Sequence, residues 1–201
     1  IMGHIDGWTP MGDLPPPFDT DPRLRAAMAN ELVDAIAKLG QVDWRAAGLG
    51  DFGKPQGFLE RQVDRWLAHL ANIQFRELPG LSEAAQWLRR HTPRSFKPGI
   101  IHGDYQFANV MYAHGAPARL AAIVDWEMTT IGDPLLDVAW ALLGYDGENP
   151  KEQGFYLPME GMPTRSELLA HCEKGSGLAT ENNHYDRGLA PRPAGLGRAT
   201  A

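Results

Sequence analysis

The 201-residue chain has little of what several common classes of protein require. Cys172 is its single cysteine, so neither a disulfide framework nor a cysteine-based metal site is expected. No apolar run approaches the roughly 18 residues of a membrane-spanning helix, and no signal peptide is visible. The formal net charge is -6, which argues against binding the phosphate backbone of nucleic acid. We therefore expect no membrane or nucleic-acid partner, and a cytoplasmic location.

Two catalytic patterns are also missing. The 7 histidines are scattered, without a His-x-His or His-x-x-x-His spacing, so a zinc site is not expected. No Gly-x-Ser-x-Gly sequence is present to form the nucleophile turn of a serine hydrolase. The composition, 43% hydrophobic and 22% charged, is sufficient for one soluble domain with a substantial core.

The most informative stretch is 100–109, whose core reads His-x-Asp-x-x-x-x-Asn. Asp125 follows sixteen residues after Asn109, at the end of a short apolar run. Mg²⁺ prefers oxygen ligands, so Asn109 and Asp125 are candidate metal ligands, and a turn between them and Asp104 would aim Asp104 at a substrate hydroxyl. His102 is interpreted as a packing and hydrogen-bonding support for the loop. The alternative is that these are ordinary turn and strand-end residues.

The flanking residues predict short strands around this loop. Gly99–Ile101 leads into the loop and Asn109–Tyr112 leaves it, a turn follows at Ala116 and Pro117, and Leu120–Val124 returns. These segments are interpreted as a β-hairpin that delivers the two carboxylates and the amide to one end.

A second triplet, Asp51-Phe52-Gly53, spells the metal-binding triplet of protein kinases. It precedes the catalytic loop instead of following it, and Gly48, Gly50 and Pro55 around it indicate a surface loop. We assign it no metal role.

Together these segments resemble the aminoglycoside phosphotransferase and choline kinase family. The likeness lies in His102–Asn109 with Ile123–Glu127, and again in Gly132–Ala139. A closer likeness is to the phosphotransferase domains associated with acyl-CoA dehydrogenases, and it is carried by Gly48–Pro55, Phe58–Val63 and Gly161–Leu168. The likeness covers most of the chain.

The resemblance implies a role for each matching residue. Asp104 would be the catalytic base or hydroxyl-orienting group, and Asn109 and Asp125 would hold Mg²⁺ on the phosphates of ATP. Glu127 would lie close to the metal site in a supporting role. Asp137 would hold the catalytic loop from the start of a buried helix.

The resemblance also implies the fold class. We expect an α+β fold equivalent to the C-terminal lobe of protein kinases, mainly helical with a small catalytic β-hairpin, and with the N-terminal lobe absent. Residues 1–18 are interpreted as a remnant of the hinge strand and a Pro-rich connector, and 19–180 as the catalytic lobe. Residues 181–201 lack a helical period and are expected to be a disordered tail.

Apolar periodicity predicts the helices of this lobe. Two helices carry an apolar stripe that we expect to pack into the core, the alternative being a partner-binding face. The stripes are Leu24, Met28, Leu32, Ile36 and Leu39 in the first, and Leu59, Val63, Trp66, Leu67 and Leu70 in the second. Thr20 or Asp19 is the expected cap of the first helix, and Thr164 with Glu167 forms a capping box before the last. The predicted helices are 22–40, 58–71, a short one after Ser82, 134–143 and 164–174.

The function expected from these features is that of an ATP-dependent small-molecule kinase. It would move the γ-phosphoryl group of ATP to the hydroxyl of a small-molecule acceptor. An inactive fragment or pseudo-kinase is the alternative, and a metal-dependent phosphohydrolase is less favoured because metal-binding histidines are not found. The acceptor and the oligomeric state stay open.

Overall fold

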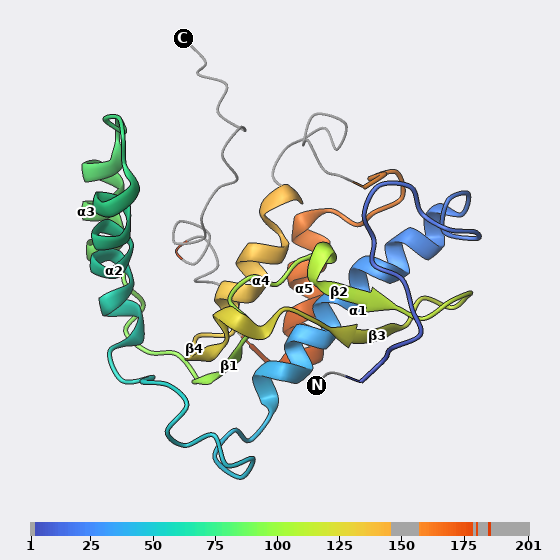
Figure 1. Ribbon diagram of the computed structural model, residues 1–201, viewed down its shortest axis with the longest axis horizontal. Helices are drawn as coiled ribbons and strands as arrows, with labels where there is room; N and C mark the ends of the chain where they lie inside the picture. Colours follow the sequence, from blue (N-terminus) through green and yellow to red (C-terminus); the bar gives the residue numbers. More distant parts are fainter. Residues whose placement is uncertain (1–2, 146–156, 179, 181–184, 186–201) are drawn as a thin grey trace.

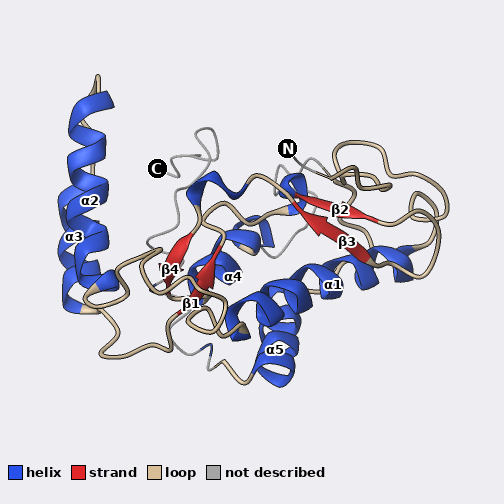
Figure 2. Ribbon diagram, turned by 60° about the horizontal axis from the view of Figure 1, so that its bottom comes forward, coloured by secondary structure: helices blue, strands red, loops and turns tan. Residues whose placement is uncertain are grey.

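The computed structural model describes residues 3–145, 157–178, 180 and 185. Helix α1 (Pro22–Gln41) runs through the main body, with α5 (Arg165–Ser176) packed along it and α4 (Leu135–Ala141) beside both (Figure 1). Two small two-stranded sheets complete the body (Figure 2). None of the helices within the described ranges is both long and apolar enough to cross a membrane.

The N-terminus of α1 is set by Asp21 and Pro22. The Asp21 carboxylate accepts a hydrogen bond from the backbone N–H of Arg23, and Pro22 occupies the first turn, where its missing N–H is harmless. The cap predicted at Asp19 or Thr20 was therefore wrong by one or two residues. The capping box predicted at Thr164 and Glu167 is present.

The strands form two separate antiparallel pairs. β1 (Gly99–Ile101) pairs with β4 (Thr130–Gly132), and β2 (Val110–Tyr112) pairs with β3 (Leu120–Ile123). The predicted hairpin is therefore correct only for β2 and β3. The strand that enters the loop pairs with β4 instead, which three residues were too few to predict. Trp8 adds an isolated bridge to β2.

The core lies between α1, α4, α5 and the β2–β3 pair. The predicted apolar stripe of α1 faces it, with Met28, Leu32 and Ile36 each at most 1% exposed. Two tyrosines attach the segment 105–112 to α1, since the Tyr105 hydroxyl donates to Leu32 O at 2.8 Å and the Tyr112 hydroxyl to Met28 O at 2.6 Å. Burial raises the pKa of both tyrosines well above its usual value, so they remain neutral donors.

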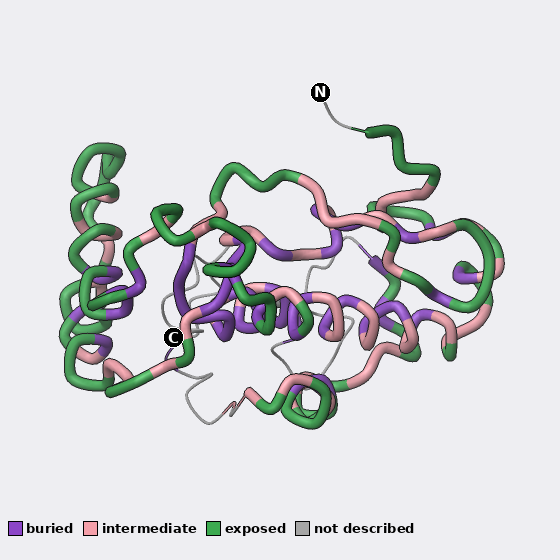
Figure 3. The backbone as a smooth tube through the Cα atoms, turned by 90° about the horizontal axis from the view of Figure 1, so that it is seen from below, coloured by how far each residue is buried: buried purple, intermediate pink, exposed green. Residues whose placement is uncertain are grey.

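Helices α2 (Phe58–Ile73) and α3 (Leu81–Arg90) form a hairpin that projects from the main body (Figure 1). Figure 3 shows that it is exposed over most of its length and buried only near its base. The apolar stripe predicted to pack into the core along the whole of α2 is therefore buried only in its first half. The members left half-buried are Trp66, Leu67 and Leu70.

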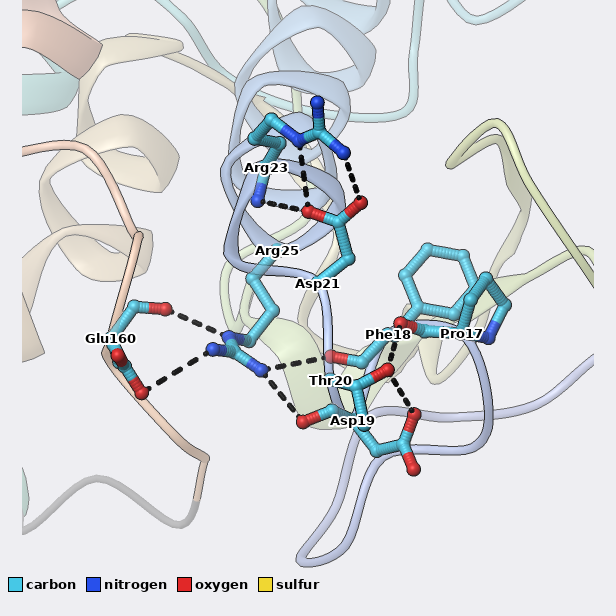
Figure 4. Close-up of polar contacts among 8 residues, drawn as sticks. All are labelled: Pro17, Phe18, Asp19, Thr20, Asp21, Arg23, Arg25 and Glu160. Carbon is cyan, nitrogen blue, oxygen red and sulfur yellow. Dashed lines mark hydrogen bonds and ion pairs between the residues drawn. The ribbon is translucent and has the colours of Figure 1, made fainter.

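A buried arginine joins two segments that are far apart in the sequence. Arg25 is 3% exposed and donates hydrogen bonds to the carbonyl oxygens of Phe18, Asp19 and Glu160 (Figure 4). The Glu160 carboxylate lies 3.6 Å from the guanidinium. A buried cation is tolerated only when its N–H groups find acceptors, so these contacts fix the loop before α1 against the segment around residue 160.

The predicted tail, 181–201, lies outside the described residues apart from Tyr185. Tyr185 is fully buried, in an apolar cluster that includes Phe58 and Leu88 at the base of the α2–α3 hairpin.

Candidate active site

The loop between β1 and β2 is held by Asp137 of α4. The Asp137 carboxylate accepts the backbone N–H of His102 at 2.5 Å and that of Gly103 at 2.8 Å. Asp137 is 1% exposed, and burial raises its pKa to about 6, although the two N–H donors oppose this shift. These are the contacts expected of a residue that supports the loop.

Gly103 is required by the shape of this loop. Its φ of +90° lies in the region that side chains disfavour, and an added Cβ would stand 2.7 Å from the carbonyl oxygen of Met128. The loop therefore passes directly against the backbone of the segment that follows Asp125.

His102 connects the loop to the residue before Asp125. Its Nε2 lies 2.8 Å from the carbonyl oxygen of Val124, and its Nδ1 lies 3.3 Å from the backbone nitrogen of Asp104. A neutral ring with the proton on Nε2 satisfies both contacts, because Nε2–H donates and Nδ1 accepts. The ring is fully buried and makes an edge contact with Trp126, with centroids 5.1 Å apart.

The Asp104 carboxylate is held by three side chains. Its Oδ1 accepts from Trp140 Nε1 at 2.7 Å and from Gln106 Nε2 at 2.8 Å, and its Oδ2 accepts from Asn109 Nδ2 at 2.9 Å. The carboxylate therefore has a defined orientation, with fewer donors at Oδ2 than at Oδ1.

Asn109 and Asp125 are brought together by the β2–β3 pair. The backbone N–H of Val124 donates to Asn109 O at 2.9 Å, so Asp125 follows immediately after a residue bonded to Asn109. Asn109 Nδ2 also donates to the backbone oxygen of Asp104 at 2.8 Å, which leaves the amide oxygen as its acceptor for a ligand. Asp125 is exposed, with φ 64° and ψ 61°, and its side chain makes no capping bond.

This donor set fits Mg²⁺. An amide oxygen and one carboxylate are the kind of partial oxygen shell that Mg²⁺ completes with water and phosphate oxygens. Among the described residues, no three His, Cys, Asp or Glu side chains are grouped so that they could hold a metal ion. Glu127 is exposed in the short helix Trp126–Met128 that follows Asp125, close in sequence to the pair.

The segment 48–53 also spells Gly-x-Gly-x-x-Gly, the letters of a phosphate-binding loop, which the sequence reasoning overlooked. It consists mostly of exposed turns between α1 and α2 and does not join a strand to a helix. Without that context the letters do not indicate a nucleotide site. Asp51 is exposed in the same turns.

A cavity of about 430 Å³ opens beside the loop, between the base of α2 and α4. Its walls are mainly apolar, with a few polar side chains from α2. The lining side chains include Phe58, Gln62, Arg65, Trp66, His69, Met128, Leu136 and Trp140. Because Trp140 both lines this cavity and bonds to Asp104, the cavity adjoins the carboxylate. Sequence reasoning missed Trp66, His69 and Trp140 as site residues, since no motif includes them.

The model of the phosphotransferase enzyme family matches residues 8–165. The chain belongs to this family. The family predicted from the His-x-Asp-x-x-x-x-Asn segment is thus confirmed, and the fold is that of the kinase-like phosphotransferases.

A comparison with one curated relative agrees with this family assignment. The chain is 29% identical over 174 residues to human acyl-CoA dehydrogenase family member 11, which covers 85% of this chain and 22% of the relative. This confirms the predicted likeness to acyl-CoA dehydrogenase-associated domains.

Two solved structures share the fold. One is a Ralstonia eutropha protein assigned as an aminoglycoside phosphotransferase, with a TM-score of 0.76, 26% identity and coverage of 94% of this chain and 57% of that one. The other is the aminoglycoside phosphotransferase APH(3'')-Id of Streptomyces rimosus in complex with ADP and streptomycin, with a TM-score of 0.54, 14% identity and coverage of 83% and 62%. The chain thus spans less than two thirds of each protein with which it is compared.

Proposed function

We propose that this chain carries the catalytic centre of an ATP-dependent small-molecule kinase. The observation that carries the proposal is the orientation of Asp104, whose carboxylate is held by three donors, one of which, Trp140, lines the neighbouring cavity. A carboxylate in that position can bind the hydroxyl of a molecule in the cavity and direct its oxygen toward a phosphate. We assign residues 19–180 to the C-terminal, catalytic lobe of a kinase-like enzyme.

Asp104 would accept the proton of the acceptor hydroxyl, or orient that hydroxyl, during transfer of the γ-phosphoryl group. Its Oδ2 has only the Asn109 donor within the described part of the chain, so the hydroxyl would bind on that oxygen. No covalent intermediate on the protein is required, because positioning and electrostatic stabilisation supply most of the catalysis in such reactions.

Asn109 and Asp125 would hold Mg²⁺ through the Asn109 amide oxygen and the Asp125 carboxylate. Bound there, Mg²⁺ would neutralise charge on the phosphate oxygens of ATP. Asp137 and His102 would support these residues without contacting substrate, since the first holds the backbone of the loop and the second joins it to Val124. Glu127 would support the metal site from the short helix that follows Asp125.

The cavity is proposed as the site of the acceptor. Its aromatic and aliphatic walls favour an acceptor with an apolar body, and the Arg65 guanidinium would disfavour a polycation. The hydroxyl of such an acceptor would reach Asp104 past the edge of Trp140.

The proposal is tested by calorimetry of Mg·ATP binding and by an acceptor screen on the whole chain. Asp125→Ala is expected to abolish Mg-dependent binding, whereas Asp51→Ala, which changes an exposed carboxylate in the other kinase-like triplet, should bind as the wild type does. Asp104→Asn should bind Mg·ATP normally and transfer phosphate about a thousandfold more slowly. Mg·ATP binding that is unaffected by Asp125→Ala would contradict the assignment, and phosphate release to water alone would indicate a hydrolase.

A further inference from the structure

We infer that Trp140 is a positioning residue that holds the Asp104 carboxylate in its reactive orientation. We also infer that this hydrogen bond becomes stronger when a ligand occupies the adjoining cavity. The inference rests on the proposed function and assigns a role to a residue that belongs to no motif. It comes from one contact, the 2.7 Å hydrogen bond from Trp140 Nε1 to Asp104 Oδ1.

The position of Trp140 on α4 makes this contact specific. Trp140 lies three residues after Asp137, so the two side chains share one face of the helix. Asp137 binds the backbone N–H groups at the start of the loop, and Trp140 binds the side chain of Asp104. A single helix thus fixes both the path of the loop and the direction of its carboxylate.

The hydrogen bond also selects which oxygen of Asp104 faces the acceptor. Trp140 and Gln106 both donate to Oδ1, whereas Asn109 is the one donor to Oδ2 among the described residues. Loss of the Trp140 donor would free the carboxylate to rotate and would weaken this selection. The indole N–H can donate but cannot accept a proton, so Trp140 acts through Asp104 and not on the substrate proton.

The indole ring also forms a wall of the cavity, where it is half-buried. A ligand that enters the cavity would exclude water from the ring edge and from its hydrogen bond. Hydrogen bonds to a charged group strengthen as the local dielectric constant falls, so an apolar acceptor would tighten the orientation of the carboxylate it must meet.

The contact is tested first by NMR of the indole N–H groups. The chain has 6 tryptophans, so six indole signals are expected, and Trp140→Phe identifies one of them. Asp104→Ala should move that signal upfield by removing its charged acceptor, whereas Asp51→Ala should leave it unchanged. If the chemical shift of the Trp140 indole N–H does not change in Asp104→Ala, the inference is overturned, whether or not the chain is active.

The positioning role is tested by steady-state kinetics with Mg·ATP and 4-phenyl-1-butanol as the acceptor. In a second assay the alcohol is omitted, so that water is the acceptor. Trp140→Phe keeps an aromatic wall but removes the donor, so kcat should fall about tenfold while the acceptor KM changes little. Trp44→Phe is the matched control, because Trp44 also donates an indole hydrogen bond, to Pro98 O at 3.3 Å, but lies outside the lining of the cavity; it should leave both kcat and the acceptor KM unchanged.

Equal kcat for Trp140→Phe and the wild type, or the same pattern in both variants, would show that Trp140 only packs. A wild-type chain that transfers phosphate to neither acceptor, or to water alone, would instead contradict the proposed function, and the positioning role would fall with it. The indole signal separates the two failures, since it reports the contact without turnover.

Discussion

The carboxylate of Asp137 lies 2.5 Å from the backbone nitrogen of His102. This contact, with a second one to the next N–H of the chain, connects a buried helix to the loop that carries the candidate catalytic carboxylate. The two residues are far apart in the sequence, so the loop is formed by the folded body and not by local preference alone.

Asp137→Ala should destabilise the chain by about 2–4 kcal/mol, because two buried backbone N–H groups would lose their acceptor. Urea unfolding followed by circular dichroism measures this change. Asp64→Ala is the control, since Asp64 pairs with Arg89 on the exposed hairpin and should contribute less than about 1 kcal/mol. Equal costs for the two variants would contradict the supporting role of Asp137.

The pH dependence of stability should reveal Asp133. Burial raises the pKa of this carboxyl from 3.8 to about 6, against the effect of the hydrogen bond from Leu135 N. Between pH 4 and 6 the unfolded chain releases this proton and the folded chain retains it, so stability falls as pH rises. The loss from Asp133 alone should reach about 3 kcal/mol above pH 6 and be absent below pH 4. Asp137, whose pKa burial also raises to about 6, adds a loss of the same sign.

Asp133→Asn keeps an acceptor for Leu135 N but cannot ionise. Its free energy of unfolding should therefore rise relative to the wild type between pH 4 and 6, as measured by urea titrations at each pH. A difference between the two proteins that stays constant with pH would show that Asp133 titrates normally.

Gly103→Ala should disrupt the candidate active site. The new Cβ would approach the carbonyl oxygen of Met128 to 2.7 Å at a φ of +90°, so we expect a loss of about 2–4 kcal/mol and a large loss of transfer activity. Gly115→Ala has a similar φ of +73° but meets nothing within 4 Å, so it should cost only about 1 kcal/mol. Thermal unfolding of the two variants isolates the steric contribution.

Arg25→Met should destabilise the chain by about 2–4 kcal/mol. The methionine preserves much of the buried stem, but three carbonyl oxygens lose their donors. Glu160→Ala removes a carboxylate whose side chain is 83% exposed and leaves the backbone acceptor of that residue in place, so its cost should stay below about 1 kcal/mol. Chemical unfolding measures the free energy of unfolding of both variants. A loss for Glu160→Ala as large as that for Arg25→Met would assign the stability to the ion pair.

Features encoded in neighbouring residues could be predicted from the sequence. The 3.6-residue repeat of Met28, Leu32 and Ile36 gave α1 and its buried face, and Thr164 with Glu167 gave the start of α5. The family was recognisable because its motif occupies one short loop and one strand end.

Features that depend on distant segments could not be predicted. β4 has three residues and pairs with β1 only because the fold brings them together. Trp140 resembles any apolar residue of a buried helix until its indole is placed beside Asp104. The prediction that the whole apolar stripe of α2 is buried was also wrong, because periodicity shows that a face is apolar but not what covers it.

The two tyrosine hydroxyls that bond to α1 make the position of the segment 105–112 depend on the helical repeat of α1. Their acceptors, Leu32 O and Met28 O, are four residues apart, which is about 6 Å along the axis and slightly more than one full turn. Tyr105 in the loop and Tyr112 at the end of β2 are therefore spaced by the pitch of α1. One residue inserted between Met28 and Leu32 would turn one acceptor about 100° away from its tyrosine. The length of α1 between those two carbonyl groups thus sets the register of the segment that carries the candidate catalytic residues.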